Sequence, residues 1–300
     1  MNKPNPRSIL RVAIAAFAII GALHAGGARA AEETIAALAN QTHFHGIAVD
    51  AADPSRIYLA THHGLFVTGP NGKTQPVSST RDDFMGFTTH PSDPSILMAS
   101  GHPAGGGNLG FILSKDGGRS WQKIASGVNG SVDFHQMDVS KADPNVVFGV
   151  FGDLQRSSDG GHTWARVAPA PAGIIALAAS SQDVTVLYAA TQTGLMRSSD
   201  GGRKWQPIYD AKGPATMAHV TRDGRLYAFV VGTGLIRTSE KNFSWQALGS
   251  GFGDDYVLHL AADPTNERKL YAVTFNSRTH AQRVIASGDG GTSWTTLGAE

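Results

Sequence analysis

The sequence predicts an all-β protein, a six-bladed β-propeller built from four-stranded antiparallel blades. Three observations carry this prediction. A phrase rich in Ser, Asp and Gly and ending in Trp recurs every 40 to 50 residues. A second repeat precedes it, in which two apolar stretches flank a turn that often contains Asp-Pro. Six units of this kind fit the chain, and such a period is typical of folds in which each unit buries one face against the next.

Residues 1–30 are expected to be a signal peptide. Basic side chains precede the apolar run 12–23, and Ala28-Arg29-Ala30 forms a small-x-small cleavage sequence. The apolar run is shorter than a membrane span requires. The sequence contains no Cys, which excludes both an anchoring lipid on a cysteine and disulfide bonds. We therefore expect an exported protein, periplasmic or secreted.

Residues 31–42 are expected to be an N-terminal segment with a short helix over 31–40, and residues 43–300 a single propeller domain. The formal charge of +1 depends on the leader, because without its four basic residues 21 Lys and Arg face 24 Asp and Glu. A balance of about −3 favours neither nucleic acid nor an anionic membrane surface as partner. We expect a monomer that does not insert into a membrane.

Short apolar stretches at even spacing, separated by turn sequences, predict the strands of each blade. No segment offers a strand for exchange between the first and last blades, so we expect the ring to close by side-chain packing. The first two strands of the six blades, with the turn between them, are expected at 45–61, 85–100, 135–150, 175–191, 217–230 and 258–274.

A third strand, the repeated phrase and a fourth strand complete each blade. The phrase predicts a hairpin turn, because an Asp carboxylate accepts hydrogen bonds from nearby N–H groups and Gly-Gly adopts left-handed dihedrals. The fourth copy keeps Thr238, Glu240 and Trp245 but has lost both glycines. The copies occupy 114–121, 157–164, 198–205, 238–245 and 287–294.

These phrases resemble the Asp-box, or BNR, signature S-x-D-x-G-x-x-W, and the resemblance covers essentially residues 43–300. Proteins with this signature include sialidases, sortilin-type receptors and photosystem II assembly propellers. The resemblance implies a β-propeller whose boxes are structural and lie on the face away from the working site.

Polar side chains gather where blades one to three begin. In a propeller, the start of the innermost strand and the loop after the second strand lie on one face, beside the channel mouth. Imidazole and thioether groups in this position suit copper or zinc. We predict a metal site whose principal ligands are His45, Met85, His102 and His135, with His43, His62 and His63 as alternates or supporting residues.

Two other interpretations stay open for this face. The side chains can bind an organic ligand or glycan, or they can simply satisfy one another at a wet channel mouth. A sialidase is disfavoured because no FRIP-type arginine motif and no Glu at the channel mouth are present. A glycoside hydrolase using two carboxylates stays the alternative function, with Asp83, Asp133 and Asp255 as candidate catalytic residues.

The preferred prediction is therefore a binding or assembly module. Its ligand, a protein or a glycan, would bind at the channel-mouth face, with copper or zinc as the expected metal.

Overall fold

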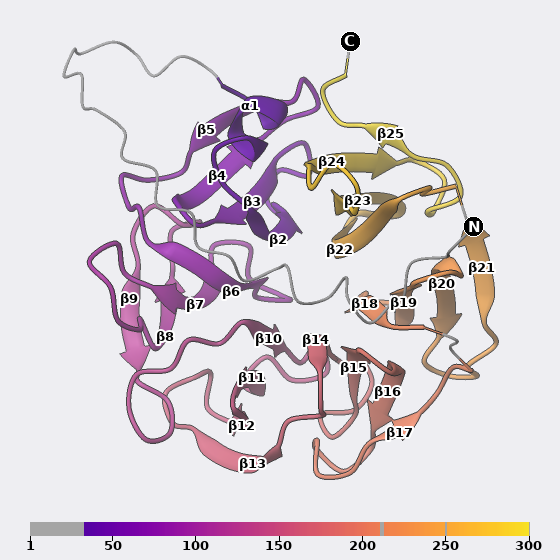
Figure 1. The fold of residues 1–300 in the computed structure, drawn as a ribbon. Helices are drawn as coiled ribbons and strands as arrows, with labels where there is room; N and C mark the ends of the chain where they lie inside the picture. The colour runs from indigo at the N-terminus through magenta and orange to yellow at the C-terminus, as the bar shows by residue number, and fades with distance from the viewer. Residues whose placement is uncertain (1–32, 211–212, 250, 300) are drawn as a thin grey trace.

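The computed structural model describes residues 33–210, 213–249 and 251–299. The predicted signal peptide lies outside these residues. The described chain forms six antiparallel sheets arranged as blades around a central axis (Figure 1), which confirms the predicted six-bladed propeller. In each blade the first strand of the sequence repeat, which in blade one is β2 (Phe44–Val49), lies innermost. Contacts between these neighbouring innermost strands line the axis.

The strands follow the order expected from the repeats. Blade one contains β1 (Glu33–Thr34), β2 (Phe44–Val49), β3 (Ile57–Thr61), β4 (Gly64–Thr68) and β5 (Lys73–Pro76). Blade two contains β6 (Asp83–Thr89), β7 (Leu97–His102), β8 (Phe111–Ser114) and β9 (Gln122–Ala125). Blade three contains β10 (Gln136–Val139), β11 (Val147–Phe151), β12 (Asp153–Ser157) and β13 (Ala165–Pro169).

The second half of the ring repeats this plan. Blade four contains β14 (Ile174–Ala179), β15 (Leu187–Thr191), β16 (Gly194–Ser198) and β17 (Gln206–Pro207). Blade five contains β18 (Ala215–Val220), β19 (Arg225–Val230), β20 (Gly234–Ser239) and β21 (Gln246–Gly249). Blade six contains β22 (Asp255–Asp263), β23 (Asn266–Asn276), β24 (Gln282–Ser287) and β25 (Thr295–Thr296).

The seam between blades one and six closes the ring. The expected N-terminal helix is shorter than 31–40: α1 spans Ile35–Ala39 and follows β1, which pairs with β5 at the outer edge of blade one. Ile35 and Leu38 of α1 are buried with Val284 of blade six. The N–H of Phe44 donates to Oε1 of Gln282 across the seam (2.7 Å). Apolar packing and this hydrogen bond join the two blades, and the described strands of each sheet come from its own segment of the chain.

The repeated turns connect the third and fourth strands through one hydrogen-bond pattern. In blade three, Ser157 Oγ donates to Asp159 (2.8 Å) and accepts from the N–H of Gly161 (2.9 Å). Asp159 also accepts from the N–H of Thr163 (2.8 Å), and the indole of Trp164 donates to the Gly161 carbonyl (2.9 Å). The same Ser–Asp–Gly contacts recur at Ser114, Ser198 and Ser287.

Each turn also locks its blade to the previous one. Gly161 has a φ of +90°, and a Cβ there would lie 2.0 Å from the Phe111 ring of blade two, so only glycine fits. The Trp164 ring packs between Phe111 (5.4 Å between ring centroids) and Phe134 (4.8 Å). The N–H of Gly160 donates to Asn145, in the turn between the first two strands. The turn therefore lies on the face opposite the start of the innermost strand.

The fourth copy of the phrase works differently. Without its glycines, the acidic side chain of Glu240 does not close its own turn and instead crosses to blade four. It accepts hydrogen bonds from the N–H of Ser181 (3.0 Å) and the hydroxyl of Tyr188 (3.0 Å). An acid expected to hold a local turn thus joins two blades.

Candidate functional site

A β-bulge near the start of the innermost strand positions the side chains of the channel mouth. In blade one, the pairing of β2 with β3 shifts between Phe44 and Gly46, which leaves His45 between them. A bulge re-aims the side chain of the extra residue. In blade three, His135 directly precedes β10 at the equivalent position. Blades two, four, five and six have the same shift in register between their first two strands. The residues at the bulge position in these blades are Met85, Ile175, Thr216 and Leu258.

Imidazole and thioether side chains occupy the bulge positions of blades one to three, whereas blade five has Thr216 there. His45, Met85 and His135 of blades one to three line the central channel, which has a volume of about 200 Å³. Ile175 and Leu258 line it on the other side. The structure thus places three of the predicted ligands on the channel wall, and their role as metal ligands stays a prediction.

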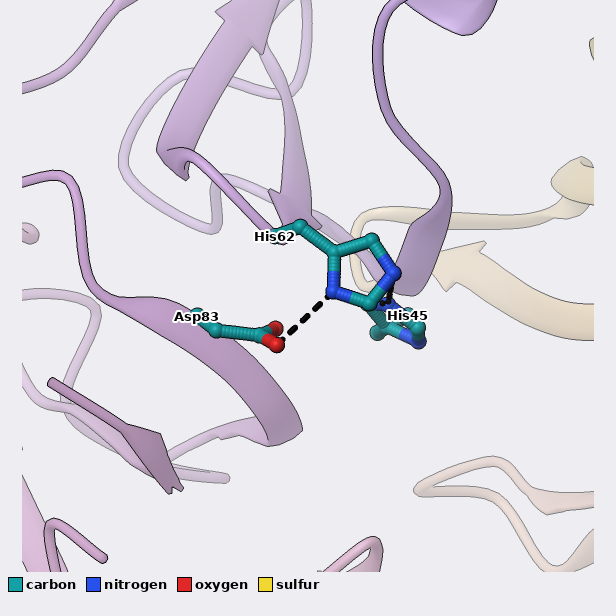
Figure 2. Close-up of side chains that lie close together, drawn as sticks. All are labelled: His45, His62 and Asp83. Atoms are coloured by element: carbon teal, nitrogen blue, oxygen red, sulfur yellow. Dashed lines mark hydrogen bonds and ion pairs between the residues drawn. The ribbon is translucent and has the colours of Figure 1, made fainter. Parts of the chain in front are cut away.

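A first cluster of polar side chains lies at the seam of blades one and two. It consists of His45, His62 and Asp83 and is here called triad one (Figure 2). His62 Nδ1 lies 2.7 Å from Asp83 Oδ2. His45 Nε2 lies 3.0 Å from His62 Nε2. One donor atom from each residue falls within 4.8 Å of the other two. Oδ1 of Asp83 is buried and has no hydrogen-bond partner among the described residues.

The electrostatics of triad one favour neutral imidazole. Burial, and then the neighbouring ring of His62, lower the pKa of His45 to about 2. His45 is therefore uncharged at neutral pH and keeps a nitrogen lone pair for a cation. His62 is more accessible, with 36 % of its side chain exposed, so solvent reaches the cluster on the side of His62.

A second cluster, triad two, lies at the seam of blades two and three and consists of His102, Asp133 and His135. Nε2 of His135 lies 2.6 Å from Asp133 Oδ2, and Nε2 of His102 lies 3.0 Å from the same oxygen. The hydrogen bond to Asp133 raises the pKa of His135, more than burial lowers it. Asp133 is only 5 % exposed, whereas the two imidazoles face solvent.

Blade two brings the two triads together. Asp83 of triad one and His102 of triad two are direct cross-strand partners in β6 and β7. Gly101 permits this pairing, because a Cβ at its φ of +150° would lie 1.9 Å from the carbonyl oxygen of Asp83. The Gly-rich loop after β7 then folds over, with the N–H of Ala104 donating to Asp82 (3.1 Å). One short strand pair therefore supplies a member to each cluster.

The remaining predicted site residues surround these clusters or lie apart from them. Met85 lines the channel on blade two, between the bulge positions of blades one and three. The ring of His43 lies 5.5 Å from that of His62, beside triad one. His63 is exposed, and its backbone N–H donates to Thr61. The expected ligand set is thus divided: His45 and His62 belong to one cluster, and His102 and His135 to the other.

The carboxylate candidates are all engaged in the structure. Asp83 and Asp133 contact imidazoles, as described above. Asp255, in blade six, is 6 % exposed and accepts hydrogen bonds from Asn276 (2.6 Å) and from Arg283. None of the three faces a channel-mouth cleft as a free carboxyl group.

A polar cluster deeper in the channel was not predicted from the sequence. Asp138 in β10 accepts from Lys141 (2.6 Å), from the N–H of Ala179 in blade four (2.8 Å) and from Thr88 in blade two (3.2 Å). It ties three innermost strands together. The available signal was an acid inside a predicted innermost strand, where an unpaired charge is costly.

Comparison with known proteins supports the fold. No known protein family and no curated protein matches the chain in sequence. Among solved structures, a GH74 enzyme of Niastella koreensis has a TM-score of 0.61 and 17 % identity, covering 85 % of this chain and 45 % of that one. The GH74 xyloglucanase of Xanthomonas campestris has a TM-score of 0.55 and 18 % identity, with the same coverage. A YCF48 structure with a bound D1 peptide has a TM-score of 0.53 and 16 % identity, covering 85 % and 82 %.

The chain spans 45 % of the length of the two GH74 proteins. At these identities the likeness establishes a β-propeller module. Among the described residues, no helix has the length and hydropathy to cross a membrane.

Proposed function

We propose that this protein is an exported propeller of the Asp-box type that acts as a binding or assembly module, with a copper ion on its channel-mouth face. The carrying observation is triad one, in which donor atoms of His45, His62 and Asp83 all lie within 4.8 Å of one another. The His43 ring lies 5.5 Å from that of His62, and Met85 lines the same channel as His45.

The hydrogen-bond pattern of triad one supports a cation. Nε2 of His45 lies 3.0 Å from Nε2 and 3.2 Å from Nδ1 of His62. Nδ1 of His62 also lies 2.7 Å from Oδ2 of Asp83. A proton on Nε2 of His45 can bridge the two imidazoles, and so can a metal ion bound by one nitrogen of each ring.

Copper is favoured over zinc by the thioether of Met85, which lines the same channel as His45. Imidazole suits both metals, whereas a Met sulfur at a site without thiolates is typical of copper. Because the ring of His45 is neutral, no proton need leave it before it binds the ion.

Binding is favoured over glycoside hydrolysis by the state of the carboxylates. A hydrolase needs two carboxyl groups facing an open cleft, one of them able to donate a proton. Asp83 and Asp133 are each held by imidazole rings, and Asp255 is held by Arg283 and Asn276. These contacts hold all three carboxylates against neighbouring side chains.

Export and a macromolecular partner complete the proposal. The charged, apolar and small-residue pattern of residues 1–30 supports export. The YCF48 structure carries a D1 peptide, and the GH74 neighbours are glycosidases, so propellers of this shape bind extended ligands. We assign a protein or glycan ligand to the channel-mouth face, where the triads and the Gly-rich loop of blade two lie.

The test is copper(II) titration of untagged protein, with zinc(II) as the competing ion. A His45→Ala, His62→Ala double variant is expected to bind one ion fewer per chain than the wild type. The matched control, His162→Ala with His280→Ala, also removes two histidines and is expected to keep the wild-type stoichiometry. Equal stoichiometry in all three proteins would refute the metal site of triad one.

A further inference from the structure

The orientation of one imidazole in triad two points to a second cation. Nδ1 of His102 lies 2.8 Å from the carbonyl oxygen of Gly107. A carbonyl oxygen can only accept, so this nitrogen carries the proton. In the neutral ring, the other nitrogen, Nε2, then has a lone pair and no hydrogen.

This nitrogen lies close to an anion. Nε2 of His102 lies 3.0 Å from Oδ2 of Asp133. Two acceptors at this distance repel each other unless a positive charge lies between them or on the ring. His135 cannot supply it by an ordinary hydrogen bond, because its proton lies on its own 2.6 Å contact to the same oxygen. The contact between His102 and Asp133 is therefore unexplained by neutral side chains.

The carboxylate of Asp133 can also accept a further hydrogen bond or bind a cation. Asp133 is 5 % exposed, and its Oδ1 is buried without a hydrogen-bond partner among the described residues. A buried carboxylate oxygen without a partner is costly. Oδ1 of Asp133 thus has no donor in the described part of the chain, and Oδ2 faces one imidazole nitrogen, that of His102, without a proton between them.

We infer that His102, Asp133 and His135 hold a second divalent cation of the zinc class, separate from the ion of triad one. Neutral imidazole and carboxylate are the ligands zinc accepts in sites that keep an open position. A ligand histidine that donates its other N–H to a backbone carbonyl, as His102 does to Gly107, is the usual supporting contact of such sites.

The spacing of the donors is compatible with this assignment. Ligands at about 2.0–2.1 Å around a tetrahedral ion lie roughly 3.3 Å apart. The observed contacts of 2.6 and 3.0 Å need to open by roughly 0.7 and 0.3 Å to reach this spacing. The imidazoles can do so because 39 % of the His102 side chain and 47 % of the His135 side chain are exposed. The exposed side leaves a fourth position for water or for a donor of the partner molecule.

Two ions would then lie in adjacent seams, each with one ligand from blade two. Asp83 and His102 are cross-strand partners, yet Asp83 belongs to the site of triad one and His102 to that of triad two. Triad two does not depend on triad one, so each site can be tested while the other is intact.

The experiment is zinc(II) titration by calorimetry, with metal analysis after dialysis, on the full mature chain without a histidine tag. The wild type is expected to bind two ions. A His102→Ala, His135→Ala double variant is expected to bind one, and so is the His45→Ala, His62→Ala variant. A variant with all four substitutions should bind none, and the His162→Ala, His280→Ala control should bind two.

The outcomes separate the two sites. Loss of one ion only in the His102→Ala, His135→Ala variant supports the second site even if triad one fails. An unchanged stoichiometry in that variant overturns the second site, even if triad one binds. Asp133→Asn provides a check with little change of shape: it keeps the side-chain size, should retain the melting temperature of the metal-free protein, and should weaken zinc binding at least tenfold.

A proton is the competing explanation for the same contact. If His102 is a permanent imidazolium, its ring carbons will titrate above pH 7 by NMR and zinc will not displace the proton at micromolar concentration. That result would also overturn the proposal.

Discussion

Oε1 of Glu240 in blade five accepts a hydrogen bond from the buried hydroxyl of Tyr188 in blade four, at 3.0 Å. Oε2 of the same carboxylate accepts from the backbone and hydroxyl of Ser181. Where the other repeated turns use their acid locally, this turn uses it to join two blades.

Glu240→Ala is expected to destabilise the protein by about 1–3 kcal/mol, because it leaves the Tyr188 hydroxyl, on a side chain only 1 % exposed, without its acceptor. Urea unfolding of Glu240→Ala, Tyr188→Phe and the double variant measures the pair. We expect a coupling energy of about 1 kcal/mol. Lys241→Ala, one residue along, is the control and should change stability little. Strict additivity would contradict the inter-blade role of Glu240.

The repeated turns are expected to hold the fold without taking part in binding. Ser157→Ala removes the acceptor for the buried N–H of Gly161 and should cost about 1–3 kcal/mol in unfolding free energy. Metal and ligand affinities of the folded variant should match the wild type, because the turn lies on the opposite face from the triads. A folded Ser157→Ala protein with weakened binding would show that the turn has a functional role.

Trp164 is expected to be a main contact between blades two and three. Its half-buried ring packs on Phe111 and Phe134, so Trp164→Ala should cost about 3 kcal/mol, the lower end of the range for such a change. Trp164→Phe keeps an aromatic ring in the same place and should recover part of this loss. Thermal unfolding monitored by circular dichroism measures both, and a melting temperature unchanged in Trp164→Ala would argue against the packing role.

Stability is expected to fall as the pH drops from 7 to 5, because two channel histidines stay neutral in the fold. Burial lowers the pKa of His219 and of His259 to about 4. The unfolded chain binds protons on these rings from about pH 6.5 downward, while the folded chain does not. The stability they contribute is therefore complete above pH 6.5 and is lost toward pH 4.

We expect a loss of about 2 kcal/mol for each ring between pH 7 and pH 5. Urea unfolding at both pH values, for the wild type, His219→Gln and His259→Gln, tests this. Each variant should show a smaller drop than the wild type. A His162→Gln control, in an exposed turn, should show the wild-type drop.

The sequence by itself determined the fold. The hydrogen bonds of the repeated turn and the spacing of the apolar stretches depend only on residues close together in sequence. The boxes at Ser157 and Ser287 and the strands between them could therefore be predicted directly. The face that carries His45 and His135 could also be read, because both directly precede or begin innermost strands, and all such starts lie at one end of the blades.

Only the tertiary structure decided which side chains meet. The sequence grouped His45 with His102 and His135, whereas the folded chain divides them between two seams. That division depends on the close pairing of Asp83 with His102, which Gly101 permits, and on the path of the Gly-rich loop. The reach of Glu240 to Tyr188 and of Asp138 to blades two and four has the same origin. Contacts across a seam depend on how separate blades pack, and this information lies in no single repeat.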